Sequence, residues 1–307
     1  MARELVLDLS SYQAGFTIDT FKSLGVKKHI VKVTEGTTYV NPYANVLVNR
    51  AAAAGADGFA FYHFARFGAN VEQAKAEAQF FINTAKSKFK LAQGATLICD
   101  AELKYMSSDA VIAFLDEIKA AGYQTGFYTY KFLLPQFDLD RIKPHMDYFW
   151  LASYPTKVGD RNPSFSYFPS ANYVDLWQYT DNFLGDTVDA SITVSDRALE
   201  MFNPKNVVKV ETPKTETAVS TPKTWIDNYG WKWVEENGTF TSDTAINLRW
   251  GASPQSDLIS VLPAGSVVKY TAFSRHGGYV WLRQPRANGK DGYLICREGN
   301  KPLGTFK

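Results

Sequence analysis

Roughly the first two hundred residues alternate short apolar runs with longer segments in which apolar side chains recur every three or four positions. The short runs are rich in Val, Ile, Leu, Phe and Tyr and contain few charges, which is typical of strands buried on both faces. The expected strands are residues 5–8, 29–33, 58–62, 95–99, 124–128, 148–151 and 174–177.

The longer segments have the signals of helix ends. Residues 71–86 follow Asn70, a good N-cap, and residues 108–121 stop at Gly122. A third helix is expected over the alanine-rich residues 42–54. Because strands alternate with helices, we predict an α/β fold with a mainly parallel sheet. Seven or eight such units favour an irregular TIM-like β/α barrel over an open sheet.

The composition of the chain changes twice, which divides it into three parts. Residues 1–202 carry the strand and helix pattern just described. Residues 203–224 are rich in threonine, proline and alternating charge, so we expect an extended linker there. Residues 225–307 contain short β-prone pieces that are separated by glycine, proline and asparagine turns. This last part is expected to form a small all-β barrel.

Composition and charge exclude several classes of protein. The formal net charge of +2 over 307 residues is too small to argue for a nucleic-acid partner. Two cysteines, Cys99 and Cys296, do not make a disulfide framework. The first residues lack the apolar core of a signal peptide, and no apolar run approaches the ~20 residues of a membrane span. We therefore expect synthesis in the cytoplasm without a signal peptide, and no membrane span.

The most informative chemistry follows the apolar run of residues 95–99, which ends in Asp100, Ala101 and Glu102. Alternate side chains of a strand share a face, so both carboxylates point the same way, with Cα atoms roughly 6–7 Å apart. Two close acids compete for ionisation, and one of them keeps its proton near neutral pH. Glycoside hydrolases use such a pair, in which one carboxyl group is protonated and the other is ionised. A solvated loop start would carry the same residues.

The other strand ends favour the catalytic interpretation. In a β/α barrel the chemistry sits where the strands end, and acids and aromatic residues recur at those positions here. Burying several carboxylates close together costs folding free energy, so such a cluster indicates a functional role. Each acid taken alone could instead cap a helix or fix a turn. A cleft with acidic residues at its base and aromatic residues along its sides is suited to binding a sugar. The further candidate residues at these strand ends are Asp8, Glu35, Asp189, Tyr62, Tyr128, Tyr154, Trp177 and Gln178.

No competing chemistry stands out. The four histidines are scattered without metal-ligand spacing, so no metal is expected. There is no Ser-His-Asp signature, no phosphate-binding loop and no dinucleotide glycine pattern, so we expect no cofactor. His63 lies at a strand end, where it could touch substrate or be satisfied by neighbouring acids.

Residues 1–202 resemble the family 25 glycoside hydrolases, the muramidases found in phage endolysins and bacterial autolysins. The matching pieces come in the family's order and span the whole segment, although Ala14 replaces a proline or glycine that is common there. The pieces are residues 8–13, 32–39, 58–64, 100–102, 126–129, 177–180 and 188–191.

This resemblance implies cleavage of the β-1,4 bond between N-acetylmuramic acid and N-acetylglucosamine. Carried over by position, Glu102 would be the general acid/base and Asp100 its partner carboxylate. Asp8 and Asp189 would complete the acidic floor, with Glu35 close by. The residues expected to bind the sugar are Tyr62, Tyr128, Tyr154, Trp177 and Gln178.

The last part of the chain resembles bacterial SH3-type cell-wall-binding domains. The resemblance rests on residues 246–253, 262–266, 278–283 and 292–294. Many of the aromatic residues there are expected in the core, and we favour this place for Trp250 and Trp281. The implied partner of this domain is bacterial peptidoglycan.

Together these features predict a monomeric peptidoglycan hydrolase of the phage endolysin type, which acts on the bacterial wall after release. Two alternatives stay open: a wall-binding protein without catalysis, and a glycosidase of another N-acetylated glycan such as chitin. The intact pair of Asp100 and Glu102 argues against the first. The sequence leaves open whether the anomeric configuration is retained or inverted.

Overall fold

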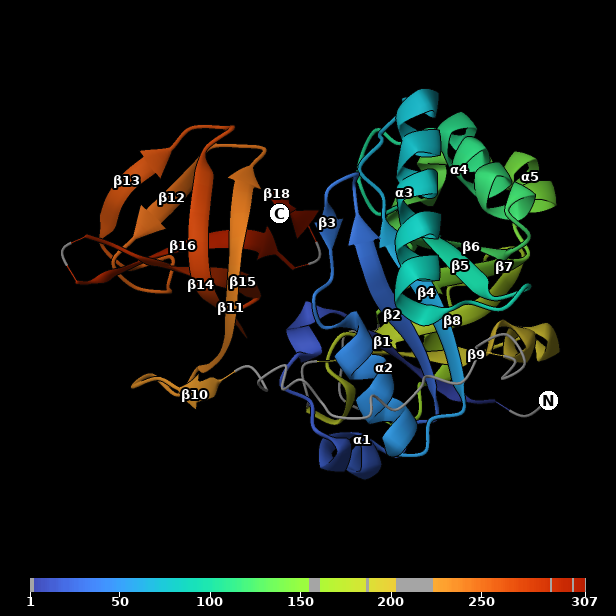
Figure 1. Ribbon diagram of the computed structural model, residues 1–307, viewed down its shortest axis with the longest axis horizontal. Coiled ribbons are helices and arrows are strands. Elements are labelled where there is room, and N and C mark those ends of the chain that lie inside the picture. The colour runs from blue at the N-terminus through green and yellow to red at the C-terminus, as the bar shows by residue number, and fades with distance from the viewer. Residues whose placement is uncertain are drawn as a thin grey trace. The chain divides into compact units, whose positions relative to one another are not determined.

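The structure is a computed structural model in which residues 3–154, 161–185, 188–202, 223–287, 289–299 and 301–306 are described. The chain divides into two compact units, residues 1–216 and 217–307 (Figure 1). Residues 203–222 of the expected linker lie outside the described residues. Thr224, its last expected residue, already belongs to the first strand of the second unit.

The first unit is a closed barrel of mixed strand direction. Neighbouring strands pair in the order β1-β9-β8-β7-β6-β5-β4-β2, and the pairing of β1 with β2 closes the ring. All of these pairs are parallel except the two that β9 makes. The short strand β3 (Tyr39–Val40) pairs antiparallel with the last two residues of β2, Thr34 and Glu35. The barrel strands are β1 (Leu5–Leu9), β2 (Lys28–Glu35), β4 (Gly58–Phe64), β5 (Thr96–Asp100), β6 (Gln124–Tyr130), β7 (Tyr148–Ala152), β8 (Val174–Thr180) and β9 (Asp189–Thr193).

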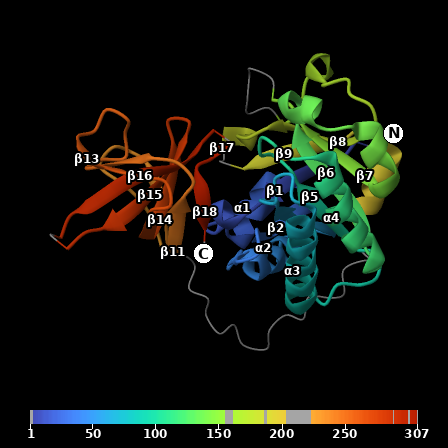
Figure 2. The same cartoon turned by 90° about the horizontal axis from the view of Figure 1, so that it is seen from above.

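Helices cover the first half of the barrel more fully than the second. Among the described residues, the connections after β7 and β8 hold only short 3₁₀ turns, so the barrel is irregular. The two longest helices, α3 and α4, pack side by side (Figures 1 and 2). The helices are α1 (Ile18–Leu24), α2 (Ala44–Ala53), α3 (Val71–Phe89), α4 (Ser108–Ala120) and α5 (Leu139–Ile142).

Local sequence explains where these elements begin and how closely they pack. The Asn70 side chain accepts a hydrogen bond from the Gln73 amide at 3.0 Å, which satisfies one free N–H at the start of α3. Gly126 lies in β6 beside Ile98 of β5. A Cβ at Gly126 would come within 2.6 Å of the Ile98 side chain, so only glycine allows this close approach of the two strands.

The second unit is all-β, as expected, and every strand pair in its described residues is antiparallel. The strand order is β10-β11-β14-β15-β16-β12-β13, with β17 added to β16 and β18 to β11. The strands are β10 (Thr224–Ile226), β11 (Lys232–Ser242), β12 (Ile246–Arg249), β13 (Leu258–Leu262), β14 (Val267–His276), β15 (Tyr279–Pro285), β16 (Asp291–Glu298), β17 (Lys301–Pro302) and β18 (Gly304–Phe306).

Two tryptophans of this unit have different places. Trp281 is fully buried and packs with Trp233 and Ala272, which confirms its place in the core. Trp250 corrects the expectation, because 40% of its surface is exposed. It follows the end of β12, where the side chains of Arg286 and Lys290 lie over its ring. No helix in the described part of the chain is long and apolar enough to cross a bilayer.

Candidate active site

The strand β5 delivers two acids to the same end of the barrel. Asp100 is its last residue and is buried, while Glu102 is half-buried. Between them, the amide of Ala101 donates to the carbonyl of Tyr128 at 2.9 Å, and the Thr129 hydroxyl donates to the carbonyl of Ala101 at 2.8 Å. The chain past β5 is therefore still held against β6. This support keeps both acids on one side of the barrel wall.

The side chain of Tyr62 shows that the expected acids converge. Burial raises the pKa of Tyr62 well above its usual value, and four negative charges nearby raise it further. Because these charges all act on one phenol, the four carboxylates lie near the Tyr62 side chain. In order of their effect, the four acids are Asp8, Asp100, Asp189 and Glu102.

Two of these acids come from neighbouring strands. Asp8 in β1 and Asp189 in β9 are directly opposite each other in the antiparallel pair. Opposite residues of such a pair have Cβ atoms about 4.5–5.5 Å apart and project from the same face. Both side chains are half-buried. Because β9 runs antiparallel to its neighbours, its first residue, Asp189, lies at the end of the barrel where the parallel strands finish.

Aromatic rings form the support beneath the acids. The ring of Trp150 lies 4.2 Å from that of Tyr128 and 6.4 Å from that of Tyr62, between ring centroids. The Trp150 indole N–H donates to Ser191 Oγ at 2.9 Å, so its orientation is fixed. All three rings are buried. Tyr62 and Tyr128 therefore serve mainly as the inner wall of the site.

Gln178 connects the tyrosines to the acidic cluster. Its Oε1 accepts hydrogen bonds from Tyr128 Oη at 2.7 Å and from Tyr154 Oη at 2.8 Å. Since both bonds go to the oxygen, the amide nitrogen must face the other way, and Nε2 lies 3.5 Å from Asp8 Oδ2. The Tyr154 hydroxyl also contacts Tyr130 Oη at 3.0 Å.

Glu35 reaches the same end of the barrel by an irregularity in β2. In a regular strand, Lys32 and Glu35 would point to opposite faces. A register shift between Lys32 and Thr34 brings them together, and Lys32 Nζ lies 2.5 Å from Glu35 Oε2. The guanidinium of Arg66 lies 4.0 Å from the same carboxylate. The carboxylate of Glu35 is thus balanced by the cations of Lys32 and Arg66.

Trp177 lies away from this cluster, which corrects an expectation from the sequence. Adjacent residues of a strand point to opposite faces, and Gln178 takes the inner face of β8. Trp177 is fully buried, packs against Phe165 and Phe168, and donates its indole N–H to the carbonyl of Ser153 at 2.9 Å. It therefore cannot line a sugar-binding cleft.

His63 also points away from the site. Its Nε2 lies 2.9 Å from Glu77 Oε2, and its Nδ1 lies 2.8 Å from Thr34 Oγ1. Burial lowers the pKa of His63, although Glu77 opposes this effect. Of the two roles left open for His63, the structure favours a histidine that is satisfied by its neighbours.

Sequence reasoning missed two residues of the site, Tyr130 and Trp150. Burial raises the pKa of Tyr130 well above its usual value, and the charges of Glu102 and Asp189 add to this effect. Tyr130 follows Tyr128 by two positions, so the alternation of side chains along β6 would have found it. The described residues contain no group of three or more His, Cys, Asp or Glu that could hold a metal ion.

A barrel with acids gathered at one end belongs to a class of fold that many glycoside hydrolases use. Residues 7–186 match the model of the glycosyl hydrolases family 25, and the chain belongs to this family.

Curated relatives agree with this assignment. The chain is 31% identical over 245 residues to the lysozyme of Streptococcus phage Cp-9, covering 77% of this chain and 63% of that one. It is 27% identical over 301 residues to a D-alanyl-L-alanine endopeptidase of Streptococcus phage B30, covering 94% of this chain and 64% of the relative. The chain thus spans a little less than two thirds of the length of these relatives.

Solved structures agree on the fold. The catalytic domain of the endolysin ply40, from bacteriophage P40 of Listeria monocytogenes, matches with a TM-score of 0.54 and 23% identity, covering 64% of this chain and 96% of that one. The modular Cpl-1 endolysin in complex with a peptidoglycan analogue matches with a TM-score of 0.53 and 23% identity, covering 94% of this chain and 76% of that one.

Proposed function

We propose that this chain is a peptidoglycan hydrolase that cleaves the β-1,4 bond between N-acetylmuramic acid and N-acetylglucosamine. The observation that carries this proposal is the gathering of acids at one end of the barrel, where Asp8 of β1 and Asp189 of β9 are register partners and Asp100 ends β5. Membership of the glycosyl hydrolases family 25 supports it, and so do the phage relatives named as lysozymes.

In the proposed mechanism Glu102 is the general acid. Mutual repulsion within a cluster of acids favours the retention of a proton by one member. Glu102 is half-buried, whereas its neighbour Asp100 is buried, so Glu102 is the better placed of the two to reach a bound sugar. It donates its proton to the glycosidic oxygen while the bond to the leaving sugar breaks.

The remaining carboxylates stabilise the positive charge that grows at the anomeric carbon. Asp8 is held for this role by the amide nitrogen of Gln178. Two routes to product remain: attack by the 2-acetamido carbonyl of the substrate, oriented by Asp100, or attack by a water that Asp100 activates. The first retains the anomeric configuration and the second inverts it. Proton NMR of the first product formed distinguishes them by its anomeric signal.

The substitution Glu102→Gln tests the proposed acid. Glutamine keeps the shape of the side chain but has no acidic proton, so the rate of wall hydrolysis is expected to fall by at least about a hundredfold. The assay follows the turbidity of purified bacterial walls, with circular dichroism to confirm folding. Near-normal lysis by the folded variant would refute the role of Glu102.

The relative named as an endopeptidase makes peptide-bond cleavage a second candidate activity. The products separate the possibilities. Reducing ends of muramic acid support the proposed bond, whereas reducing ends of glucosamine indicate a glucosaminidase or an enzyme of chitin. New free amino groups without reducing ends would indicate a peptidase.

We further propose that the second unit binds the wall, using an aromatic groove of about 810 Å³. The rings of Trp231 and His276 stack at 4.3 Å between centroids, and His276 is fixed by a contact of 2.8 Å between its Nε2 and the carbonyl of Ala252. Trp250 lies on the same groove. Exposed aromatic surface of this kind is a feature of binding sites rather than of a core.

In this proposal the chain works as a monomer and acts on the wall outside the producing cell after its release. A monomer is sufficient because the four acids around Tyr62 all come from one chain. Light scattering at assay concentration would give the mass of one chain, 34.3 kDa. A dimer mass would contradict the proposal.

A further inference from the structure

The barrel unit has a cavity of about 560 Å³ at the end opposite its acids. Arg3 comes two residues before β1, Val174 is the first residue of β8, and Val194 follows the last residue of β9. Since β9 is antiparallel to both of its neighbours, all three positions lie where the parallel strands begin. The acids lie where those strands end, so the cavity is separate from the candidate active site.

The floor of this cavity is apolar. It is made of half-buried side chains that pack against the barrel core, namely Phe165, Phe168, Ala171, Val174 and Val194. The same loop before β8 carries Tyr173, whose φ is 67°. A large side chain rarely adopts this left-handed conformation, and a hydrogen bond of 2.8 Å from its hydroxyl to Asp140 Oδ1 helps to hold it.

Two cations lie on these rings. The guanidinium carbon of Arg3 is 3.5 Å from the centroid of Phe165, a position that leaves the N–H groups at the edge of the guanidinium open to a ligand. Lys143 Nζ lies 5.9 Å from the centroid of Tyr173 and donates to the carbonyl of Met146 at 3.5 Å. Neither cation forms an ion pair with a carboxylate in the described part of the chain.

The one carboxylate among the described lining residues, Asp175, is already fully used. Nε and Nη2 of Arg197 donate to its two oxygens at 2.8 Å and 2.7 Å. Ser195 Oγ and the amide of Phe149 donate to them at 2.6 Å and 3.0 Å. These bonds occupy the four lone-pair sites of a carboxylate. Asp175 therefore cancels the charge of Arg197 and has no acceptor left for the two cations on the rings.

The environment of Lys143 also lacks negative charge. Partial burial lowers the pKa of Lys143, and the charge of Arg197 lowers it further, although Asp175 and Asp147 act in the opposite direction. The protonated amine would therefore be stabilised by an anion placed beside it.

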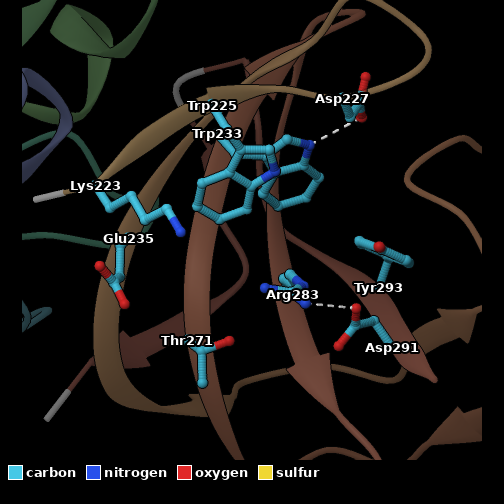
Figure 3. A pocket seen from close by; sticks show the side chains of 9 residues that line it. All are labelled: Lys223, Trp225, Asp227, Trp233, Glu235, Thr271, Arg283, Asp291 and Tyr293. Atoms are coloured by element: carbon cyan, nitrogen blue, oxygen red, sulfur yellow. Dashed lines mark hydrogen bonds and ion pairs between the residues drawn. The ribbon is translucent and has the colours of Figure 1, made fainter. Parts of the chain in front are cut away.

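A cavity in the all-β unit has the opposite arrangement, because each of its cations has an acidic neighbour (Figure 3). Arg283 Nη2 lies 2.8 Å from Asp291 Oδ2. Lys223 is next to Glu235, whose amide donates to the Lys223 carbonyl at 2.9 Å. Such a balanced cavity has no preference for an anion, whereas the excess of positive charge in the barrel cavity creates one.

The geometry favours phosphate over carboxylate. The two oxygens of a carboxylate lie in one plane and suit a single guanidinium, while the oxygens of a phosphate are tetrahedral and can meet two cations from different directions. Arginine binds phosphate through the edge of its guanidinium and lysine as a point charge. The apolar floor can hold the carbon skeleton of an ester.

We propose that this cavity binds a phosphate ester, with its phosphate between Arg3 and Lys143 and its carbon skeleton on the rings below. The source that fits is a polyol-phosphate polymer of the bacterial wall, whose many phosphates raise the effective concentration at a weak site. This source rests on the proposed function, whereas the chemistry of the ligand rests on the cavity alone.

The first test measures binding of glycerol phosphate to the full chain by isothermal titration calorimetry. We expect a dissociation constant of about 1 mM, in keeping with a few charge-assisted contacts at a partly exposed site. Glycerate, which has a carboxylate in place of the phosphate, is expected to bind about threefold to tenfold more weakly.

Variants assign the binding to the two cations. Arg3→Gln and Lys143→Gln are each expected to weaken the binding of glycerol phosphate about threefold to tenfold, with folding checked by circular dichroism. Lys22→Gln is the matched control, because it removes the same charge from an exposed position on α1, where the nearest listed carboxylate oxygen, that of Asp19, is 3.7 Å away. It should leave the affinity unchanged.

The source is tested with immobilised poly(glycerol phosphate) and with vesicles of phosphatidylglycerol, which carry the same group. The polymer should retain the wild type better than the double variant of Arg3→Gln and Lys143→Gln. The vesicles should retain both proteins equally. Retention by vesicles that depends on the two cations, without such retention by the polymer, would indicate a membrane surface and overturn the wall polymer as the source.

Equal affinity of the wild type and both single variants for glycerol phosphate would overturn the proposed site. So would an equal loss in Lys22→Gln, glycerate binding as tight as that of glycerol phosphate, or no binding at about 10 mM probe, which is weaker than a specific contact allows. Hydrolysis of a phosphate-free wall glycan is measured on the same samples and should not change in the variants. Its absence in the wild type would contradict the proposed function while leaving the binding result intact, so the two failures are distinguishable.

Discussion

At the scale of single residues, Gln178 decides how the acidic cluster is oriented. Its oxygen is occupied by the hydroxyls of Tyr128 and Tyr154, so its nitrogen is directed at Asp8. An amide is well suited to this position, because it has an acceptor at one atom and a donor at the other. Gln178 acts on the reaction through Asp8 and is a positioning residue in this account.

Replacing Gln178 with glutamate tests this role. Gln178→Glu keeps the acceptor for both tyrosines but sets a carboxylate oxygen against Asp8, where an N–H had been. We expect kcat for glycan hydrolysis to fall by about tenfold or more, which corresponds to about 1.4 kcal/mol, with little change in KM. Tyr154→Phe removes only one of the two hydroxyl donors to Gln178, so its kcat is expected to fall less than that of Gln178→Glu. An unchanged kcat in Gln178→Glu would show that Asp8 is held by other contacts.

A second residue, the buried His29, is expected to make the free energy of unfolding depend on pH. Burial lowers the pKa of His29 to about 3, and the ring packs between Phe21 and Phe59. The folded state therefore keeps this histidine neutral, while the unfolded chain binds a proton below about pH 6.5. Because the unfolded state gains the proton first, stability is full above pH 6.5 and falls as the pH decreases toward 3.

The expected loss between pH 6.5 and pH 5 is about 1.6 kcal/mol. Urea unfolding across this range measures it. In His29→Gln the slope of stability against pH should be smaller, whatever the absolute stability of the variant. Identical slopes for the two proteins would contradict the assignment to His29.

At the scale of elements, α3 shows how a cap sets the start of a helix. The Asn70 side chain accepts a hydrogen bond from the amide of Gln73. Asn70→Ala removes this bond, and the free energy of unfolding is expected to fall by about 1 kcal/mol. Chemical denaturation gives this value. The rate of glycan hydrolysis per folded molecule should not change, and a selective loss of rate would show that α3 bears on the site.

The sequence predicted the main elements because their patterns are local. The run into Asp100 is the strand β5, and Asn70 precedes α3 as expected. That helix continues to Phe89 rather than to residue 86, because Lys90 adopts the left-handed conformation that ends it. The helix end could not be predicted, since lysine is not a usual residue for that conformation.

The candidate site was predicted unevenly, for two physical reasons. Trp177 and Gln178 are adjacent in a strand, so both could not face the inside of the barrel, and the pattern alone did not say which would. Glu35 turns inward through a register shift that leaves no local signal in the sequence. The convergence of Asp8 with Asp189 depends on the antiparallel direction of β9, which is a property of the whole barrel.

At the scale of the whole molecule, the proposed activities are divided between two units with separate sheets. Trp231→Ala in the full chain removes a ring of the aromatic groove. We expect weaker sedimentation of the protein with purified walls, and an unchanged rate on soluble wall glycan. A parallel loss of both would contradict this division of roles.

The central claim is that four carboxyl groups around Tyr62 form a muramidase site in which Glu102 supplies the proton. The most direct measurement is mass spectrometry of sodium borohydride-reduced fragments from a defined wall, treated with the wild type and with Glu102→Gln. This account predicts reduced muramic acid at the new ends for the wild type, and almost none for the variant. Reduced glucosamine at those ends, or equal release by both proteins, would contradict it.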